Sequence, residues 1–106
     1  MRSMIGILKE ELARLLDSEK SYKKAIKDLP KGSFHQKRIN GHDYPYLFYR
    51  RGKKIVSKYL GNLSEADRKK LSDGIEQRKK YEGMLKEVRE NLKQLRKMIR
   101  GKKRAV

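Results

Sequence analysis

The chain has 106 residues, of which 36% are hydrophobic and 41% are charged, and it contains no cysteine. This composition argues against a broad globular core and favours long helices packed along narrow seams in one domain. The 30 basic and 13 acidic side chains give a formal net charge of +17. This charge predicts a polyanionic partner, with nucleic acid as the first choice and an anionic membrane surface as the second. Without cysteine there are no disulfides or thiolate metal sites, which fits a reducing compartment, so we expect a cytoplasmic protein.

Residues 4–29 are predicted to form the first helix. Apolar side chains recur at the a and d positions of a heptad repeat, a pattern typical of a coiled-coil seam. They are Ile5, Leu8, Leu12, Leu15, Tyr22, Ile26 and Leu29. Glu19 is the one polar interruption of this seam. Pro30 ends the helix, because proline disfavours the helical conformation in the residue before it.

Residues 33–60 are predicted to form three short antiparallel strands, a β-meander. The pair Asn40–Gly41 predicts a two-residue turn, since both central positions of a type I′ turn need a positive φ. For the second turn we expect a three-residue loop, Arg50–Gly52. Alternate residues of a central strand hydrogen-bond to opposite neighbours, and two-residue loops at both ends would require the same residues to bond to both. Pro45 removes one backbone donor, so we expect either a bulge there or proper pairing only from Tyr46.

This pairing predicts two different faces for the meander. One face is mostly apolar and is expected to pack on the helices; it carries Phe34, Pro45, Leu47, Tyr49, Ile55 and Tyr59. The other face places every aromatic ring beside a cation; it carries His35, Lys37, Tyr44, Tyr46, Phe48, Lys54, Val56 and Lys58. A slip of one residue would exchange the faces, because side chains alternate along a strand.

Residues 64–100 are predicted to form a second, longer helix with Ser64 as its N-cap. Its heptad seam consists of Leu71, Leu85, Leu92 and Ile99 in one position, and of Tyr81, Val88 and Leu95 in the other. Gly74 and Arg78 interrupt this seam, and a helix break near residue 74 is one expectation. Residues 101–106 form a basic tail that we expect to fray.

The predicted fold is therefore α+β. Two long antiparallel heptad helices hold a three-stranded antiparallel β-meander between them, in a single domain of residues 1–106. Two helices alone would leave much of each seam in contact with water. We therefore expect a homodimer that buries the rest of the seams in a four-helix arrangement.

The stretch from Leu29 to Gly61, LPKGSFHQKRINGHDYPYLFYRRGKKIVSKYLG, resembles the central motif of a family of small prokaryotic proteins. Their pattern is a helix, the sequence LPKGS, an aromatic-rich meander ending in KY[IL]G, and a long helix. This resemblance covers nearly the whole chain; it implies the order of elements and no particular activity. The meander is also similar to the arm-site DNA-binding domain of tyrosine recombinases, although Pro45 replaces the aromatic residue usual at that place.

Positive charge is most one-sided in the middle of the chain. Residues 30–63 hold 8 basic and 1 acidic side chains, whereas residues 1–29 hold 7 and 5. A basic patch attracts phosphates, and exposed aromatic rings stack on unpaired bases, while a β-ribbon can enter the DNA major groove. The competing interpretation is that the aromatic side chains only brace a small sheet.

We therefore predict a non-catalytic nucleic-acid-binding protein, for DNA or RNA. Phosphates are expected to meet Lys37, Lys54 and Lys58, together with Arg50, Arg51 and Lys53 at the second turn. Tyr44, Tyr46 and Phe48 are expected to stack on bases or to pack against the sugar-phosphate backbone. The alternative is a coiled-coil adaptor that docks an acidic protein partner on the sheet.

Other classes of function find less support in the sequence. His35 and His42 have only Asp43 nearby as a third metal ligand, so we expect no metal and no cofactor. The meander has no paired carboxylates, Ser/His/Asp arrangement or phosphate-cradling loop, so we expect no enzyme. No apolar run is long enough to span a bilayer, and the seams are too narrow for a helix lying on a membrane surface.

Overall fold

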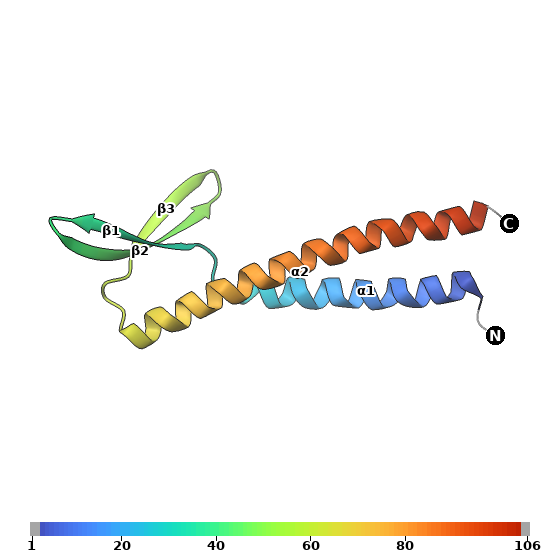
Figure 1. Cartoon of the computed structure of the whole chain (residues 1–106), viewed down its shortest axis with the longest axis horizontal. Coiled ribbons are helices and arrows are strands. Elements are labelled where there is room, and N and C mark those ends of the chain that lie inside the picture. The colour runs from blue at the N-terminus through green and yellow to red at the C-terminus, as the bar shows by residue number, and fades with distance from the viewer. Residues whose placement is uncertain (1–2, 105–106) are drawn as a thin grey trace. The chain divides into compact units, whose positions relative to one another are not determined.

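The computed structural model describes residues 3–104 (Figure 1). In chain order, the elements are α1 (Met4–Lys27), β1 (Ser33–Ile39), β2 (His42–Arg51), β3 (Lys54–Tyr59) and α2 (Glu65–Arg104). Two helices with a three-stranded antiparallel sheet between them in the chain confirm the predicted α+β class. The chain divides into two compact units: a helical unit of residues 1–28 and 80–106, and a sheet unit of residues 29–79.

The helical unit is an antiparallel pair made by α1 and the later part of α2. Its core is a single cluster of heptad residues from both helices: Leu8, Leu12, Leu15, Val88, Leu92, Leu95 and Ile99. The rings of Tyr22 and Tyr81 meet with their centroids 5.8 Å apart. These contacts confirm the predicted seams within the helical unit, because the residues that pack are those at the predicted a and d positions. Leu71, predicted to lie in the same seam, packs with the sheet core instead.

Polar groups define the start of α1 and bridge the two helices. The Ser3 hydroxyl accepts a hydrogen bond from the backbone N–H of Gly6 at 3.0 Å, as an N-cap does. The Arg89 Nε donates to a carboxylate oxygen of Glu19 at 3.2 Å, so the polar interruption of the seam finds a partner on the other helix. α1 ends at Lys27, earlier than predicted, which releases Leu29 from the helix.

The sheet has the strand order β1-β2-β3, with both neighbours antiparallel. The first turn is the predicted one: Ile39 pairs with His42, and Asn40 and Gly41 have φ angles of 53° and 83°. Positive values at both central positions are what a type I′ turn requires.

The second turn differs from the prediction. Arg51 pairs with Lys54, so the loop has two residues, Gly52 and Lys53, and not the three of Arg50–Gly52. Gly52 has a φ of 64°, as the first central residue of a type II′ turn does. With a two-residue turn at each end, His42 must direct its backbone N–H and C=O toward β1, and Arg51 must direct its own toward β3. This is possible because an odd number of positions separates the two residues, and successive residues of a strand point these groups to alternate sides.

Pro45, which has no backbone N–H to donate, lies in β2 just before the pairing with β3 begins. Its carbonyl oxygen accepts a hydrogen bond from the Leu60 N–H at 2.9 Å. The β2–β3 register begins at the next residue, Tyr46, which pairs with Tyr59, while β1 pairs with β2 on both sides of the proline. The expectation that strand pairing starts at Tyr46 is therefore confirmed for the β3 side alone.

One face of the sheet packs against the first turns of α2. The core residues are Leu47, Leu60 and Ile75, and the partly buried residues around them are Phe34, Tyr49, Leu63 and Leu71. Phe34, Leu47 and Tyr49 confirm the predicted core face. Ile55 and Tyr59 were wrongly placed on that face: the shorter turn shifts β3, so Lys58 pairs with Leu47 and Val56 pairs with Tyr49.

Helix α2 runs without a break from Glu65 to Arg104. The Ser64 hydroxyl accepts a hydrogen bond from the Asp67 N–H at 3.1 Å, which confirms the predicted N-cap. The helix continues through Gly74, so the expected break is not present, and it includes Gly101 and the residues after it up to Arg104. Residues 105 and 106 of the predicted tail lie outside the described residues.

Gly74 and Arg78 have a packing role in place of the expected break. They lie one turn apart on α2, where the segment between α1 and β1 meets the helix. A Cβ at Gly74 would lie 2.8 Å from Cγ of Pro30. The Arg78 guanidinium donates to the Leu29 carbonyl oxygen at 2.7 Å. These two residues interrupt the apolar seam because they hold the Leu29-Pro30 segment.

Candidate functional site

The sheet face opposite the core, here called the aromatic face, gathers rings from all three strands. Cross-strand pairing places His35 opposite Tyr46, and Tyr46 opposite Tyr59. Because side chains alternate along β2, Tyr44 and Phe48 share this face with Tyr46. The ring centroids of Tyr46 and Tyr59 are 5.4 Å apart, and those of Tyr44 and Tyr59 are 6.3 Å apart.

A lysine lies over two of these rings. Lys37 pairs with Tyr44, and its Nζ is 4.5 Å from the ring centroid of Tyr46 and 5.1 Å from that of Phe48. An ammonium group at this distance is attracted by the negative face of an aromatic ring. The aromatic face therefore carries its cation directly above its ring surfaces, and this cation is exposed.

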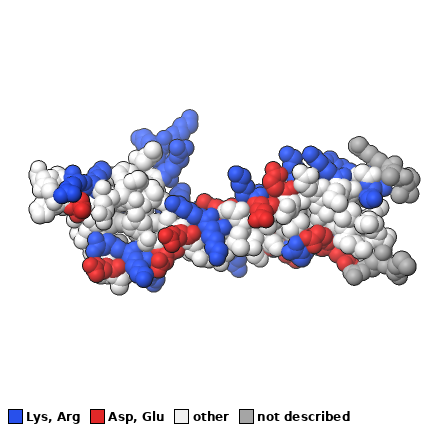
Figure 2. Space-filling view, viewed as in Figure 1, with Lys and Arg blue, Asp and Glu red and all other residues white. Residues whose placement is uncertain are grey.

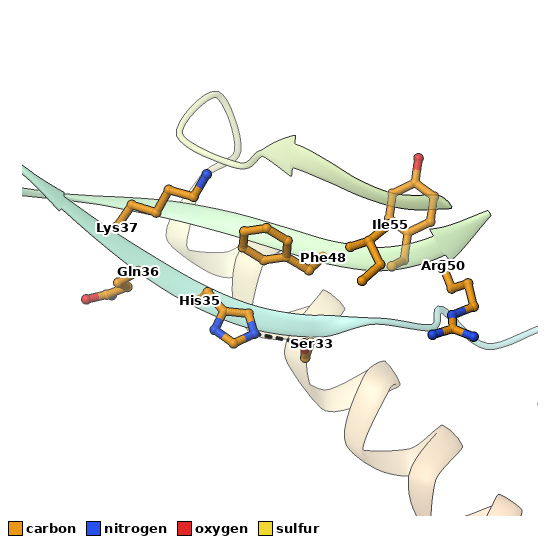
Figure 3. Close-up of a pocket in the computed structure, with 8 residues that line it drawn as sticks. Ser33, His35, Gln36, Lys37, Phe48, Arg50 and Ile55 are labelled. Carbon is orange, nitrogen blue, oxygen red and sulfur yellow. Dashed lines mark hydrogen bonds between the residues drawn. The ribbon is translucent and has the colours of Figure 1, made fainter. Parts of the chain in front are cut away.

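Phe48 lies at the centre of a shallow pocket on this face, between Lys37 and Ile55 (Figure 3). The His35 ring meets the edge of Phe48 in a T-shaped contact with centroids 4.9 Å apart. A hydrogen bond of 3.0 Å joins the His35 Nε2 to the Ser33 hydroxyl and orients the imidazole. On β3, Ser57 pairs with Phe48, and Ile55 and Tyr59 lie on either side of this serine on the same face.

Tyr59 reaches the aromatic face by packing over Gly61. A Cβ placed on Gly61 would collide with the Tyr59 ring, including its hydroxyl oxygen. Between these two residues, Leu60 is 1% exposed in the core on the other side of the sheet. The sequence KYLG thus combines one ring on the aromatic face, one leucine in the core and a glycine that makes room for the ring.

The aromatic face is open. Ile55 is 69% exposed and Tyr59 is 43% exposed, while Tyr46 and Phe48 are half-buried by their neighbours in the sheet. None of these four residues belongs to the apolar cluster that α2 closes. Within the described part of the sheet unit, this surface holds apolar rings in contact with water, an arrangement that frequently marks a binding site.

The second turn adds a compact basic cluster beside this face. Arg50, Arg51, Lys53 and Lys54 are all exposed, and Figure 2 shows Lys and Arg side chains gathered at the end of the hairpin. Arg50 pairs with Ile55 and so lies on the aromatic face, whereas Arg51 and Lys54 pair with each other on the opposite face. The turn therefore presents cations on both sides of the sheet.

Six of the nine predicted binding residues come together, and three do not. Lys37, Tyr44, Tyr46, Phe48 and Arg50 share the aromatic face, with Lys53 in the adjacent turn.

Arg51, Lys54 and Lys58 lie on the opposite face. The two lysines do so because the shorter turn shifts β3. Ile55 and Tyr59 take their places beside the rings. The odd separation of His42 and Arg51 shows that a two-residue second turn is also compatible with the backbone of β2, so the sequence alone left both registers open.

The two histidines are far apart in the pairing, as predicted. His35 pairs with Tyr46, whereas His42 pairs with Ile39 at the first turn. Among residues 3–104, no three His, Cys, Asp or Glu side chains are grouped so that they could hold a metal ion. Neither helix, over its described residues, has the length and apolar character needed to cross a membrane.

Comparison with known proteins identifies the family. A family model described as a domain of unknown function, DUF6788, matches residues 4–70, which include α1, the whole sheet and the start of α2. The chain belongs to this family, which agrees with the resemblance found in the motif from Leu29 to Gly61. No curated protein and no solved structure matches the chain.

Proposed function

We propose that this protein binds nucleic acid without catalysing a reaction, through the aromatic face and the basic turn of its sheet. One observation carries the proposal: the Lys37 ammonium lies over the Tyr46 and Phe48 rings on an open face. Rings and cations at one surface are suited to a ligand that offers both bases and phosphates. An ordinary hydrophobic docking site would exclude such exposed cations from its centre.

The charge of the sheet unit supports the same ligand. Residues 30–63 have a net charge of +7, with Asp43 as their only acid. Asp43 pairs with Arg38 near the first turn, away from the basic cluster at the second turn. Similarity of the meander to the arm-site domain of tyrosine recombinases agrees with nucleic-acid binding.

Fluorescence anisotropy with labelled DNA and RNA, measured across a range of salt concentrations, tests the proposal. We would compare a triple variant of the second turn, R50Q/R51Q/K53Q, with K24Q/K86Q/K97Q, which removes the same charge from exposed positions of the helical unit. Loss of three phosphate contacts should reduce the slope of log K against log salt by about 2 to 3. The control variant should change the slope little.

Two results would overturn the proposal. One is an equal loss of affinity in both triple variants, which would mean that total charge alone attracts the nucleic acid. The other is binding that disappears for every nucleic acid before physiological salt is reached, since a specific site keeps part of its affinity there.

We further propose that the helical unit forms a homodimer. Ile7 is 47% exposed and Met98 is 54% exposed, although each is adjacent in sequence to a buried core residue of its helix. A second copy packed along this border would remove these apolar side chains from water. Sedimentation equilibrium of the parent chain and of Ile7→Glu tests this: the parent should be dimeric and the variant monomeric, and a monomeric parent would refute the dimer.

A further inference from the structure

The aromatic face carries a more specific inference about the form of its ligand. We propose that it binds an unpaired stretch of nucleic acid, whose bases stack on Tyr46, Phe48 and Tyr59. This inference rests on the proposed function and goes beyond it, because nucleic-acid binding alone does not distinguish a single strand from a duplex.

The chemistry of the face favours stacking over the reading of base edges. A protein that reads duplex DNA places hydrogen-bond donors and acceptors against the base edges in a groove. Here the centre of the face is Phe48, with the apolar Ile55 beside it. Ring faces and an aliphatic side chain suit the flat surfaces of bases, which a duplex buries within its own stack.

The exposure of the face points in the same direction. Ile55 and Tyr59 are 69% and 43% exposed, so an unpaired base could approach them without rearrangement of the sheet. Contacts between the rings are tilted, with interplanar angles of 53° for Tyr46–Tyr59 and 51° for Tyr44–Tyr59. Tilted rings leave parts of their faces free, whereas a closed parallel stack would already have used them.

Lys37 and Arg50 supply the electrostatic part of the site. Lys37 pairs with Tyr44 and extends its ammonium over the Tyr46 and Phe48 rings, whereas Arg50 pairs with Ile55 and follows the row of rings along β2. A single strand lying along this row would place its phosphates near both cations while its bases meet the rings.

Lys37 also covers ring surface in the free protein. Its Nζ is 4.5 Å from the Tyr46 centroid and 5.1 Å from the Phe48 centroid. A phosphate would draw the ammonium toward itself, because a full negative charge attracts it more strongly than a ring quadrupole does. Phosphate binding by Lys37 would therefore uncover the ring faces on which the bases stack.

The test is anisotropy of the full chain at physiological salt with labelled oligonucleotides of about 12 nucleotides, which lies within known single-strand site sizes. The ligands are single-stranded DNA and RNA and the duplexes of the same sequences. We compare the parent with Y46L/F48L, which keeps apolar bulk and removes both rings, and with Y46F, which keeps the ring. Circular dichroism confirms that each variant is folded.

We expect the parent to prefer single strands over duplexes. Y46L/F48L should bind single strands about 10-fold or more weakly, since each lost stack costs that order of affinity. Its duplex binding should not change, and Y46F should behave like the parent. Since the chain has no tryptophan, its six tyrosines also report directly: single strands should quench tyrosine fluorescence of the parent, and duplexes should not.

Three outcomes would overturn the inference. Tighter binding of duplexes by the parent would do so, as would single-strand binding by folded Y46L/F48L that equals that of the parent. If Y46L/F48L does not fold, the tyrosine fluorescence of the parent decides: no change in this fluorescence when single strands bind would overturn the inference. In all three cases binding itself persists and the proposed function stands, whereas absence of binding to every oligonucleotide would refute both.

Discussion

Gly74 of α2 lies against Pro30, so close that a Cβ on the glycine would be 2.8 Å from the proline Cγ and 2.9 Å from its Cδ. One turn further along α2, Arg78 donates a hydrogen bond to the carbonyl of Leu29, the residue before that proline. The segment that leads from α1 into the sheet is therefore held by two adjacent positions on one helix face.

This contact predicts that Gly74→Ala destabilises the protein. Replacing a helical glycine by alanine normally stabilises a helix by up to about 1 kcal/mol. At this position the added methyl group must displace Pro30, and overpacking of this kind costs about 1 to 3 kcal/mol. Thermal unfolding should show a lower Tm for Gly74→Ala than for the parent.

Gly83 provides the matched control, because it lies in the same helix with nothing within 4 Å of a Cβ at that position. Gly83→Ala should raise the Tm. If both alanine variants raise it equally, Gly74 is not in close contact with Pro30.

Gly61→Ala should destabilise the sheet unit through Tyr59, whose ring occupies the space of the added Cβ. The ring must leave its place beside Tyr46, at an expected cost of about 0.5 to 1.5 kcal/mol, which is the value of the lost ring contact. A double-mutant cycle with Tyr59→Ala measures this coupling by urea denaturation. In the Tyr59→Ala background, Gly61→Ala should cost much less; an unchanged cost would show that the two residues do not interact.

The two faces of the sheet should respond differently to truncation of an aliphatic side chain. Leu47 is 7% exposed in the core, and its replacement by alanine should cost about 2 to 5 kcal/mol. Ile55 is 69% exposed on the aromatic face, and its replacement by alanine should change stability by no more than about 0.5 kcal/mol. Urea denaturation of the two variants compares them directly, and a large loss for Ile55→Ala would place that residue in the core.

The register of β3 can be measured without any substitution. Arg51 and Lys54 flank a two-residue turn, so Phe48 and Ser57 form a non-hydrogen-bonded pair with Cα atoms about 4.5 Å apart. NMR should show a strong nuclear Overhauser effect between their Hα protons. The three-residue loop would pair Phe48 with Lys54, and a strong Hα–Hα signal between those two residues would contradict the observed register.

Local patterns in the sequence were enough to predict the elements and part of the site. The heptad spacing of residues such as Leu8, Leu15 and Leu92 indicated the antiparallel helices, since an apolar seam of that period must be covered. Asn40–Gly41 specified the first turn through the positive φ that both residues tolerate. Alternation along β2 then placed Tyr44, Tyr46 and Phe48 on one face together with Lys37.

Tertiary packing decided the features that depend on residues far apart in the chain. Two registers of β3 satisfy the backbone of β2, and only the observed one places Leu60 on the same face as Leu47, where it packs with Ile75. The sequence around Gly74 predicts a helix break when it is considered alone. Its contact with Pro30 was not predicted, because this contact exists only when α2 meets the segment after α1. Periodicity reports which side of an element is apolar, whereas the choice between two acceptable registers depends on which side chains can be buried together.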